Sequence, residues 1–311
     1  MEQITGMQSR QVWAQDLASG ALDGQTVTFH GAVHALRKLG GIVFLTLRLR
    51  DGAVQCVCDP EKLPQELTEE CTVEVSGCPR REARAPGGCE VALEELDILS
   101  QPAQPMPVPL AKRKLHLNLD TELSLRPVVL RSLRERSVFK IQEGLSRAFR
   151  EYLTREGFTE IHTPKIVHAG AEGGSNIFRL DYFGKKAFLA QSPQFYKQTM
   201  VGVFERVFEV APVFRAEKHA TQRHLNEYTS LDFEMGYIQS FRDVMEMEAG
   251  FLRYAMDLLS REYATDLERL GIKLPRVDSI PAVSFEEAKR LASEKYGRPI
   301  RDPFDLEPEE E

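Results

Sequence analysis

The sequence lacks any long apolar run. No stretch of its 311 residues approaches the roughly 18 consecutive apolar residues of a membrane span. Its first residues, MEQITGMQSRQVW, contain no apolar core of a secretion signal. These two absences predict a cytoplasmic protein.

An excess of basic residues is also absent. The formal net charge of −7 argues, taken alone, against a protein that binds nucleic acid. Local charge matters more, because phosphates are bound by patches of basic side chains. Residues 111–140 hold eight basic and three acidic side chains, and Arg80, Arg81 and Arg84 form a second basic cluster. Either cluster could equally be an ordinary solvated surface.

The five cysteines offer no metal-binding motif. All lie in the first hundred residues, and no two have the CxxC spacing of common zinc sites. An odd number of cysteines without a secretion signal indicates reduced thiols that are buried like small apolar groups. We assign them no chemistry.

Residues 1–100 are predicted to form a small β domain. Five short runs rich in β-branched or apolar residues are separated by Gly, Pro and Asp, as strands would be. These runs are 27–33, 42–48, 53–57, 71–77 and 90–99. Five strands of this size indicate a small barrel such as an oligonucleotide-binding (OB) fold.

A proline-rich segment marks the domain boundary. Residues 101–110, QPAQPMPVPL, contain four prolines, which favour an extended and stiff connector. We therefore expect a linker and hinge region over 101–131 and a second, α+β domain over 132–311. Apolar residues at helical spacing predict a long helix over 132–156, which Gly157 ends. Two further helices are expected at about 241–263 and 285–295.

The most informative pattern is carried by two strand-like runs, 207–217 and 228–238. Alternate residues of a strand share a face, so Arg215 lies with Glu217, and Asp232 lies with Glu234. An antiparallel pairing of the two runs would put these four charged groups on one polar floor. The connecting loop holds two histidines, a lysine and an arginine, which could reach over a polyphosphate. On spacing alone, an ordinary salt-bridged hairpin remains open.

Four motifs, which follow one another along the chain in the family's order, resemble those of the aspartyl-tRNA synthetases. These enzymes are class II aminoacyl-tRNA synthetases. FRAE at 214–217, RHLNEY at 223–228 and LDFEM at 231–235 are similar to their motif 2. FTEIHTP at 158–164 is similar to motif 1, whose proline-ended strand builds a dimer interface. AQSPQFYKQ at 190–198 resembles the amino-acid-binding segment, and EGGS at 172–175 resembles the mobile loop. The resemblance implies an antiparallel-sheet catalytic domain and a homodimer with Pro164 at its interface.

The resemblance also implies an ATP site. In the family's arrangement, Arg215 holds the α-phosphate and the substrate carboxylate, and Glu217 contacts the adenine side. Arg223 and His224 meet the outer phosphates, and the ring of Tyr228 stacks on adenine. Arg215 and Glu217 are thus the expected catalytic residues, with ATP and Mg²⁺ as cofactors.

An aspartate site is implied in the same way. Gln194 and Lys197 would bind L-aspartate, with the lysine pairing with its side-chain carboxylate, and Glu172 would come from the mobile loop. Asp232 and Glu234 would orient cationic groups and receive the substrate ammonium or Mg²⁺. A lone lysine is more often a plain surface residue, and the loop glycines could be a plain turn. A site for asparagine would leave a lysine cation unpaired, which favours aspartate.

The first domain resembles the anticodon-binding barrel of the same enzymes. The resemblance implies that Phe44 stacks on the middle anticodon base and that Gln55 hydrogen-bonds to it, although Phe44 could instead be a core residue. His34 and Pro86 match members that charge tRNA(Asn) as well as tRNA(Asp), and this choice would require a tRNA-dependent amidotransferase partner. The chain departs from the family pattern at Ala32 and Leu49.

The family's last segment, motif 3, is not found after Ser240. We therefore expect a C-terminally truncated chain that has little activity alone and whose Mg²⁺ site is completed by residues outside it. Two other hypotheses stay open: a non-catalytic tRNA-binding paralogue, and an asparaginyl or lysyl relative. Residues 191–197 disfavour the second.

Overall fold

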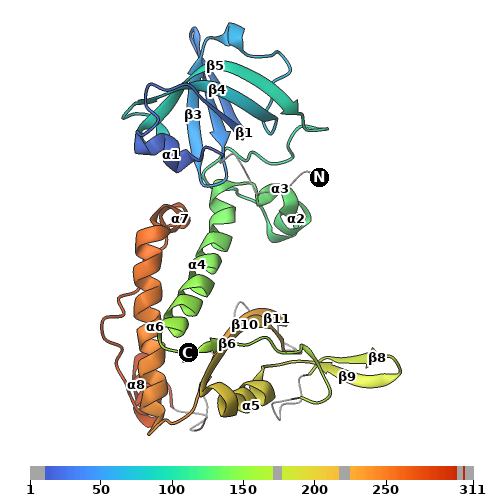
Figure 1. Ribbon diagram of the computed structural model, residues 1–311, viewed down its shortest axis with the longest axis vertical. Coiled ribbons are helices and arrows are strands. Elements are labelled where there is room, and N and C mark those ends of the chain that lie inside the picture. The colour runs from blue at the N-terminus through green and yellow to red at the C-terminus, as the bar shows by residue number, and fades with distance from the viewer. Residues whose placement is uncertain (1–10, 171–176, 217–224, 300–303, 305–311) are drawn as a thin grey trace, which may run out of the picture. The chain divides into compact units, whose positions relative to one another are not determined.

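The computed structural model describes residues 11–170, 177–216, 225–299 and 304 (Figure 1). The chain divides into two compact units, Met1–Phe139 and Lys140–Glu311.

The first unit contains a closed five-stranded barrel, as the sequence predicts. Its strands follow one another around the barrel in the order β1-β2-β3-β5-β4, and β1 pairs with β4 to close it. They are β1 (Val27–Leu39), β2 (Ile42–Arg48), β3 (Ala53–Cys58), β4 (Thr72–Arg81) and β5 (Cys89–Ser100). All pairings are antiparallel except that of β3 with β5. This is the OB architecture.

Alternation of side chains builds the barrel core. Val43, Leu45 and Leu47 of β2 are fully buried, while the residues between them are half-buried on the outer face. Burial raises the pKa of the Cys56 thiol, and four of the five cysteines are buried with free thiols. β1 runs to Leu39 instead of ending near residue 33, because the register shifts between residues 33 and 35 and pairing resumes beyond this bulge.

One glycine is required where β4 crosses β5. The register shifts between Ser76 and Gly77, and a Cβ atom on Gly77 would lie 2.5 Å from the carbonyl oxygen of Ala92. A side chain there would collide with the backbone of β5, so the close approach of the two strands depends on this residue.

The remainder of the first unit consists of short elements around the barrel. They are α1 (Ala14–Ser19), the 3₁₀ turns η1 (Pro60–Lys62) and η2 (Pro86–Gly88), α2 (Leu119–Ser124) and α3 (Arg126–Val129). Residues 101–118 form neither helix nor strand, in keeping with their prolines. Val108 and Leu110 of this segment pack with Val129 in a small separate core.

The second unit is built on two small sheets and several helices. One sheet has the order β11-β10-β6 and the other β7-β9-β8. The strands are β6 (Thr159–Glu160), β7 (Ile166–Val167), β8 (Arg179–Tyr182), β9 (Lys185–Leu189), β10 (Arg206–Phe214) and β11 (Glu227–Met235). The helices are α4 (Leu133–Arg155), which begins in the first unit, α5 (Gln194–Phe204), α6 (Phe241–Glu262), α7 (Ala264–Leu270) and α8 (Phe285–Tyr296).

The apolar face of the β10–β11 pair packs on α4. Phe208 of β10 contacts Phe149 of α4 edge-to-face with ring centroids 5.8 Å apart. Leu231, Phe233 and Met235 of β11 pack against the same cluster, as their alternation predicts. The other face of the pair is thereby left for polar groups.

Several element boundaries differ from the sequence expectation. β10 ends at Phe214 and β11 ends at Met235, each about three residues earlier than predicted. β11 ends there because Gly236 is followed by Tyr237 in the left-handed region, at φ 54°. Gly157, at φ 82°, follows α4 as expected.

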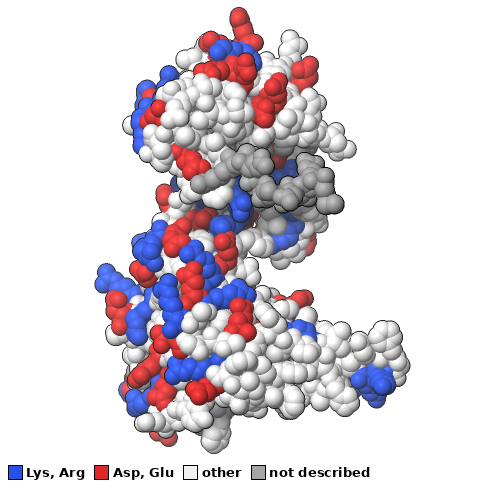
Figure 2. Space-filling model, in the orientation of Figure 1, with Lys and Arg blue, Asp and Glu red and all other residues white. Residues whose placement is uncertain are grey.

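A hairpin of β8 and β9 projects from the rest of the second unit (Figure 1). Its turn places Phe183 and Gly184 at φ 53° and 77°, and the Phe183 side chain is 90% exposed. Basic side chains gather at the far end of this hairpin (Figure 2), where Lys185 and Lys186 are exposed. Among the described residues, no helix is long and apolar enough to cross a membrane.

Candidate functional site

The polar face of the β10–β11 pair gathers the charged groups that the sequence singles out. The antiparallel register sets Val213 opposite Tyr228, so even-numbered residues of β11 share a face with odd-numbered residues of β10. Asp232, Glu234 and Tyr228 therefore lie on one face. Arg215 is half-buried and directly follows the last residue of β10. Its backbone N–H donates to Asn226 O at 3.0 Å. The ladder places Asp232 and Glu234 on one face, as the alternation predicts, while the place of Arg215 on the predicted polar floor stays a prediction.

Lys197 of α5 lies over this face. Its ammonium is 2.7 Å from Oδ1 of Asp232 and 3.2 Å from Oε2 of Glu234, and its side chain is only 14% exposed. Burial disfavours the charge, but hydrogen bonds and the negative charges of Asp232 and Glu234 outweigh it and raise the pKa of Lys197. The structure therefore holds a fixed cation here. Two of its three N–H donors serve these carboxylates.

The first turn of α5 places Gln194 on the same side of the helix as Lys197, because residues three apart are neighbours on a helix surface. The backbone N–H of Gln194 donates to the Ser192 hydroxyl at 3.2 Å. Just before it, Ala190 O accepts from the backbone N–H of Phe214 at 2.9 Å. The amino-acid-binding segment is thus bonded directly to the end of β10.

These groups suit a ligand with charges at both ends. The Lys197 cluster has one cation and two carboxylates, so it can receive an ammonium group as well as a further carboxylate. Arg215 directly follows β10, two residues beyond Val213, which is paired with Tyr228. A guanidinium suits a phosphate. Between them, Tyr228 is 36% exposed and presents a ring to the same side.

Carboxylate oxygens are the ligands that Mg²⁺ prefers, but Asp232 and Glu234 are both bound to the Lys197 ammonium. In the described part of the chain, no group of three or more His, Cys, Asp or Glu residues is arranged to hold a metal ion.

Some predicted residues cannot be placed. Glu172, Glu217, Arg223 and His224 lie outside the described residues. Pro164, between β6 and β7, is exposed, and its role at a dimer interface stays a prediction.

The barrel presents a second candidate surface. Phe44 of β2 is half-buried on the outer face, and the register sets Val57 of β3 opposite it. Gln55 lies two pairs further along the ladder and therefore on the same face. The amide of Gln55 donates to Glu90 at 3.2 Å, and Glu90 is also bound by Arg80 at 2.6 Å. This fixes the amide orientation and directs its oxygen away from Glu90. The arrangement suits a stacked base with a hydrogen-bond donor.

The other two predicted anticodon residues differ in exposure. Pro86 is exposed at the start of η2, where Gly87 and Gly88 have positive φ. His34 is only 8% exposed and lies at the bulge of β1, with no hydrogen-bond partner for its Nδ1 atom among the described residues. Burial and the charges of Arg48 and Arg136 lower its pKa against the opposing effect of Glu70.

Sequence reasoning missed a buried carboxylate next to His34. Glu70 is 7% exposed and accepts two hydrogen bonds from Arg48, at 2.5 and 2.9 Å, and one from Arg131 at 3.0 Å. Burial alone would raise its pKa, but these arginines lower it. The cluster ties the barrel to the segment before α4. No local motif marks it, because its members are far apart in sequence.

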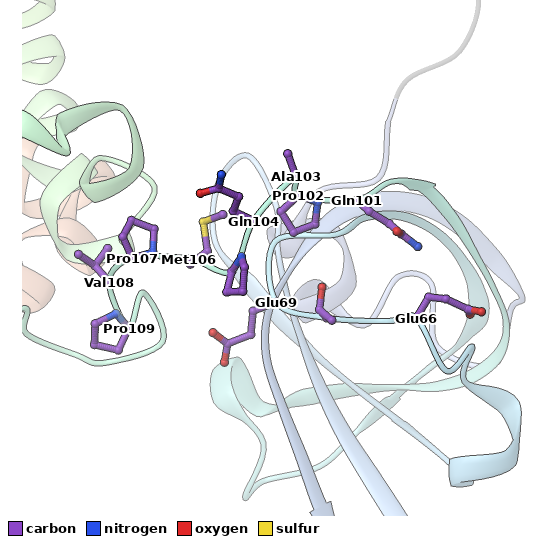
Figure 3. A pocket seen from close by; sticks show the side chains of 12 residues that line it. Glu66, Glu69, Gln101, Pro102, Ala103, Gln104, Met106, Pro107, Val108 and Pro109 are labelled. Atoms are coloured by element: carbon purple, nitrogen blue, oxygen red, sulfur yellow. The ribbon is translucent and has the colours of Figure 1, made fainter.

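A separate hollow of about 590 Å³ lies between the proline-rich segment and the turn before β4 (Figure 3). Four prolines, Met106 and Val108 line one part of it, and Glu66 and Glu69 contribute carboxylates. Its lining contains no lysine or arginine, so it does not suit an anionic nucleotide or aspartate. None of the predicted site residues lines it.

Two known families match the chain, one over the barrel and one over most of the rest. Residues 118–305 match the family described as tRNA synthetases class II (D, K and N), and residues 27–99 match the OB-fold nucleic acid binding domain. The chain is 50% identical over 290 residues to the aspartate–tRNA(Asp/Asn) ligase of Deinococcus radiodurans. The aligned region covers 93% of this chain and 66% of that protein. A ligase of the same name from Thermus thermophilus is 48% identical over 278 residues, covering 89% and 65%. The chain spans just under two thirds of the length of these relatives.

Solved structures show the same architecture. The asparaginyl-tRNA synthetase from Pyrococcus horikoshii complexed with asparaginyl-adenylate superposes with a TM-score of 0.86 at 29% identity, covering 97% of this chain and 71% of that one. The aspartyl-tRNA synthetase from Entamoeba histolytica gives a TM-score of 0.76 at 25% identity, covering 96% and 65%. With a family match over more than half of its length and an OB barrel before it, the chain belongs to the class II tRNA synthetases of the D, K and N group.

Proposed function

We propose that the protein is an aspartate–tRNA ligase, which activates L-aspartate with ATP and transfers the aspartyl group to tRNA(Asp). The observation that carries this proposal is the buried Lys197 ammonium, held by Asp232 and Glu234 of β11, whose partner strand β10 leads directly into Arg215. The names of the relatives from Deinococcus radiodurans and Thermus thermophilus support it.

The proposed reaction has two steps. A carboxylate oxygen of aspartate attacks the α-phosphorus of ATP, the bond to the bridging oxygen breaks, and pyrophosphate leaves with the bonding electrons. A ribose hydroxyl at the tRNA 3′ end then attacks the activated carbonyl carbon, and AMP leaves. Both partners of the first step are anions, so orientation and charge neutralisation carry most of the catalysis.

Different residues of this chain orient the substrates and neutralise their charges. Arg215 neutralises the α-phosphate and holds the attacking carboxylate beside it, since its planar guanidinium binds two oxygens at once. Tyr228 supplies a ring for the adenine base. Lys197 donates its third N–H to the side-chain carboxylate of aspartate, and Asp232 and Glu234 balance the substrate ammonium. Gln194 binds from the same side of α5.

Aspartate is preferred over asparagine because of charge. The side-chain carboxylate of aspartate can accept the third N–H of Lys197 in a charge-assisted hydrogen bond, which a neutral amide forms more weakly, and the substrate ammonium offsets the negative charge that this carboxylate adds. The asparaginyl and lysyl alternatives make the opposite prediction. Aspartate-dependent ATP–pyrophosphate exchange by the protein tests the proposal. Exchange that asparagine or lysine drives better than aspartate would overturn it.

The proposal extends to tRNA(Asn). It is supported by His34 and Pro86, and by the relatives named for both tRNAs at 50% and 48% identity, against 38% for the aspartate–tRNA(Asp) ligase of Pyrococcus abyssi. Charging of tRNA(Asn) with aspartate makes a product that a tRNA-dependent amidotransferase would convert. Aminoacylation of both transcripts under equal conditions tests this extension, and charging of tRNA(Asp) alone would contradict it.

The second candidate function is that of a non-catalytic tRNA-binding protein. Phe44 and Gln55 on the barrel face favour this candidate. Such a protein would bind tRNA through the barrel and show no ATP–pyrophosphate exchange. Aspartate-dependent exchange by the protein would exclude it. Homodimerisation, Mg²⁺ dependence and a cytoplasmic location belong to the proposal as well.

A further inference from the structure

A second buried lysine–carboxylate pair lies beside the Lys197 cluster. Glu209 is 3% exposed in the middle of β10, and its carboxylate accepts three hydrogen bonds. The donors are the backbone N–H of Thr163 at 2.6 Å, the Thr163 hydroxyl at 2.9 Å and the Lys165 ammonium at 2.7 Å. A buried carboxylate with this many donors from one short segment fixes that segment to the strand.

Glu209 is directly opposite Asp232 in the β10–β11 ladder. Opposite side chains share a face with Cβ atoms about 4.5–5.5 Å apart, where like charges destabilise the pairing. Here each carboxylate has its own cation, Lys165 for Glu209 and Lys197 for Asp232. The two ion pairs keep two buried negative charges compatible on neighbouring strands.

This arrangement also separates the two lysines. Lys165 has a side chain that is 19% exposed, so its ammonium needs a nearby carboxylate. Without the charge of Glu209, the carboxylate directly across the ladder is Asp232. Lys165 would then compete with Lys197 for Asp232 and would disturb the cation that faces the substrate.

The same segment is bonded to both halves of the proposed site. Lys165 O accepts from the backbone N–H of Ala190 at 2.9 Å, and Ala190 O accepts from the backbone N–H of Phe214 at 2.9 Å. Ala190 precedes the helix that carries Lys197, and Phe214 precedes Arg215. The contacts of Glu209 therefore reach the base of both elements.

We propose that Glu209, together with Lys165, is a positioning residue of the activation site. Its charge keeps Lys165 away from Asp232, and its hydrogen bonds hold the junction from which Lys197 and Arg215 are placed. This inference rests on the proposed function, because the property that the pair protects is selectivity for a dicarboxylic amino acid. Glu209 acts through its neighbours and does not touch the substrate.

The test compares a single variant of the protein, which removes one charge of the pair, with a double variant, which removes both. Glu209→Gln keeps the shape of the side chain and removes its charge. We expect the KM for aspartate to rise about 10-fold and the KM for ATP to rise less, because Lys165 competes directly with Lys197, whereas Arg215 is affected only through the hydrogen bonds of the junction. The double variant Glu209→Gln/Lys165→Met removes both charges, and its KM for aspartate should return to within about three-fold of the unmodified enzyme.

A matched control comes from the adjacent strand. Glu160→Gln breaks the Arg150–Glu160 ion pair, whose atoms are 2.9 Å apart, without removing a contact of Glu209. It should leave the KM for aspartate unchanged. An unchanged KM in Glu209→Gln, or equal losses for aspartate and ATP that the double variant does not rescue, would overturn the inference and leave Glu209 with a purely structural role.

Amide hydrogen exchange tests the positioning role of Glu209 without a measurement of activity. Glu209→Gln should accelerate exchange at the backbone N–H groups of Ala190 and Phe214, and Glu160→Gln should not. Unchanged protection at both amides would contradict the inference. Absence of aspartate-dependent exchange in the unmodified enzyme would instead refute the proposed function, and the amide measurement would still decide the positioning role.

Discussion

Lys197 and Asp232 join a helix to a strand through an ion pair of 2.7 Å, and both side chains are more than four-fifths buried. An ion pair this far removed from water is costly to form and more costly to break, because one partner alone would be a buried unpaired charge. Glu234 adds a second carboxylate at 3.2 Å. The cluster therefore carries one negative charge in excess, which suits the ammonium group of an amino acid.

Replacing Lys197 tests the cation directly. Lys197→Met should lower kcat/KM for aspartate by about 30-fold or more, because the substrate carboxylate loses its cation and meets two uncompensated carboxylates, and loss of a buried charged partner costs binding about 2–5 kcal/mol. Aspartate-dependent ATP–pyrophosphate exchange measures this. Lys186→Met, on the exposed hairpin, is the matched control and should match the unmodified enzyme. Equal activities of the two variants would remove Lys197 from the site.

A conservative substitution tests whether the planar shape of the Arg215 guanidinium is needed. Arg215→Lys keeps the charge and loses the planar, two-point contact with oxygens, so we expect kcat for exchange to fall about 100-fold or more. The melting temperature should change little, because the backbone bond from Arg215 to Asn226 remains. Arg206→Lys, at the start of the same strand, serves as the control. A mutant that keeps full kcat would show that the α-phosphate is held elsewhere.

Substitutions on the outer face of the barrel should weaken tRNA binding and leave the activation of aspartate unchanged. Phe44→Ala should raise the KM for tRNA by about 5- to 150-fold, since base–aromatic stacking is worth about 1–3 kcal/mol. Exchange without tRNA should be unchanged. Phe44→Tyr retains a ring and should behave like the unmodified protein. If Phe44→Ala instead unfolds the barrel in a thermal melt, the residue belongs to the core.

Stability should fall on acidification in two windows. The folded pKa of His34 is below its ordinary value of 6.5, so the unfolded chain binds this proton more readily and stability drops as the pH falls below 6.5. The folded pKa of Glu70 is below its ordinary value of 4.5, so its contribution is present above pH 4.5 and is lost below it.

Urea unfolding of the 311-residue chain across pH separates the two groups. His34→Leu should flatten the upper window and leave the lower one, and Glu70→Gln should do the reverse. Glu74→Gln, at a half-exposed pair with His30, is a control that should alter neither step strongly. A slope below pH 6.5 that survives in His34→Leu would assign this window to another group.

Patterns with a fixed period were predictable from sequence. Strand alternation located the shared face of Asp232 and Glu234, and the helical spacing ended where Gly157 stops α4. Strand ends were less predictable. β1 continues past a bulge at His34, and β11 stops at a left-handed Tyr237, because both depend on pairing with distant strands.

Side-chain partners across the fold were harder to foresee. The alternation that singled out Arg215 also puts Glu209 on the polar face, but its partner Lys165 is 44 residues away. Burial of His34 likewise depends on the surroundings of Arg48 and Glu70. Such contacts form only when the chain has folded, so a single sequence contains no local signal for them.

The ring of strands in the first unit has a kinetic consequence. Every strand from β1 to β5 has a neighbour on both sides, so the finished barrel offers no open backbone edge to another chain. That protection depends on the pairings of β1 with β4 and of β3 with β5, which join segments far apart along the chain. Such distant contacts form slowly. During synthesis, the barrel segment should therefore be most prone to aggregate before its last strand joins, and chaperone demand should end once the ring has closed.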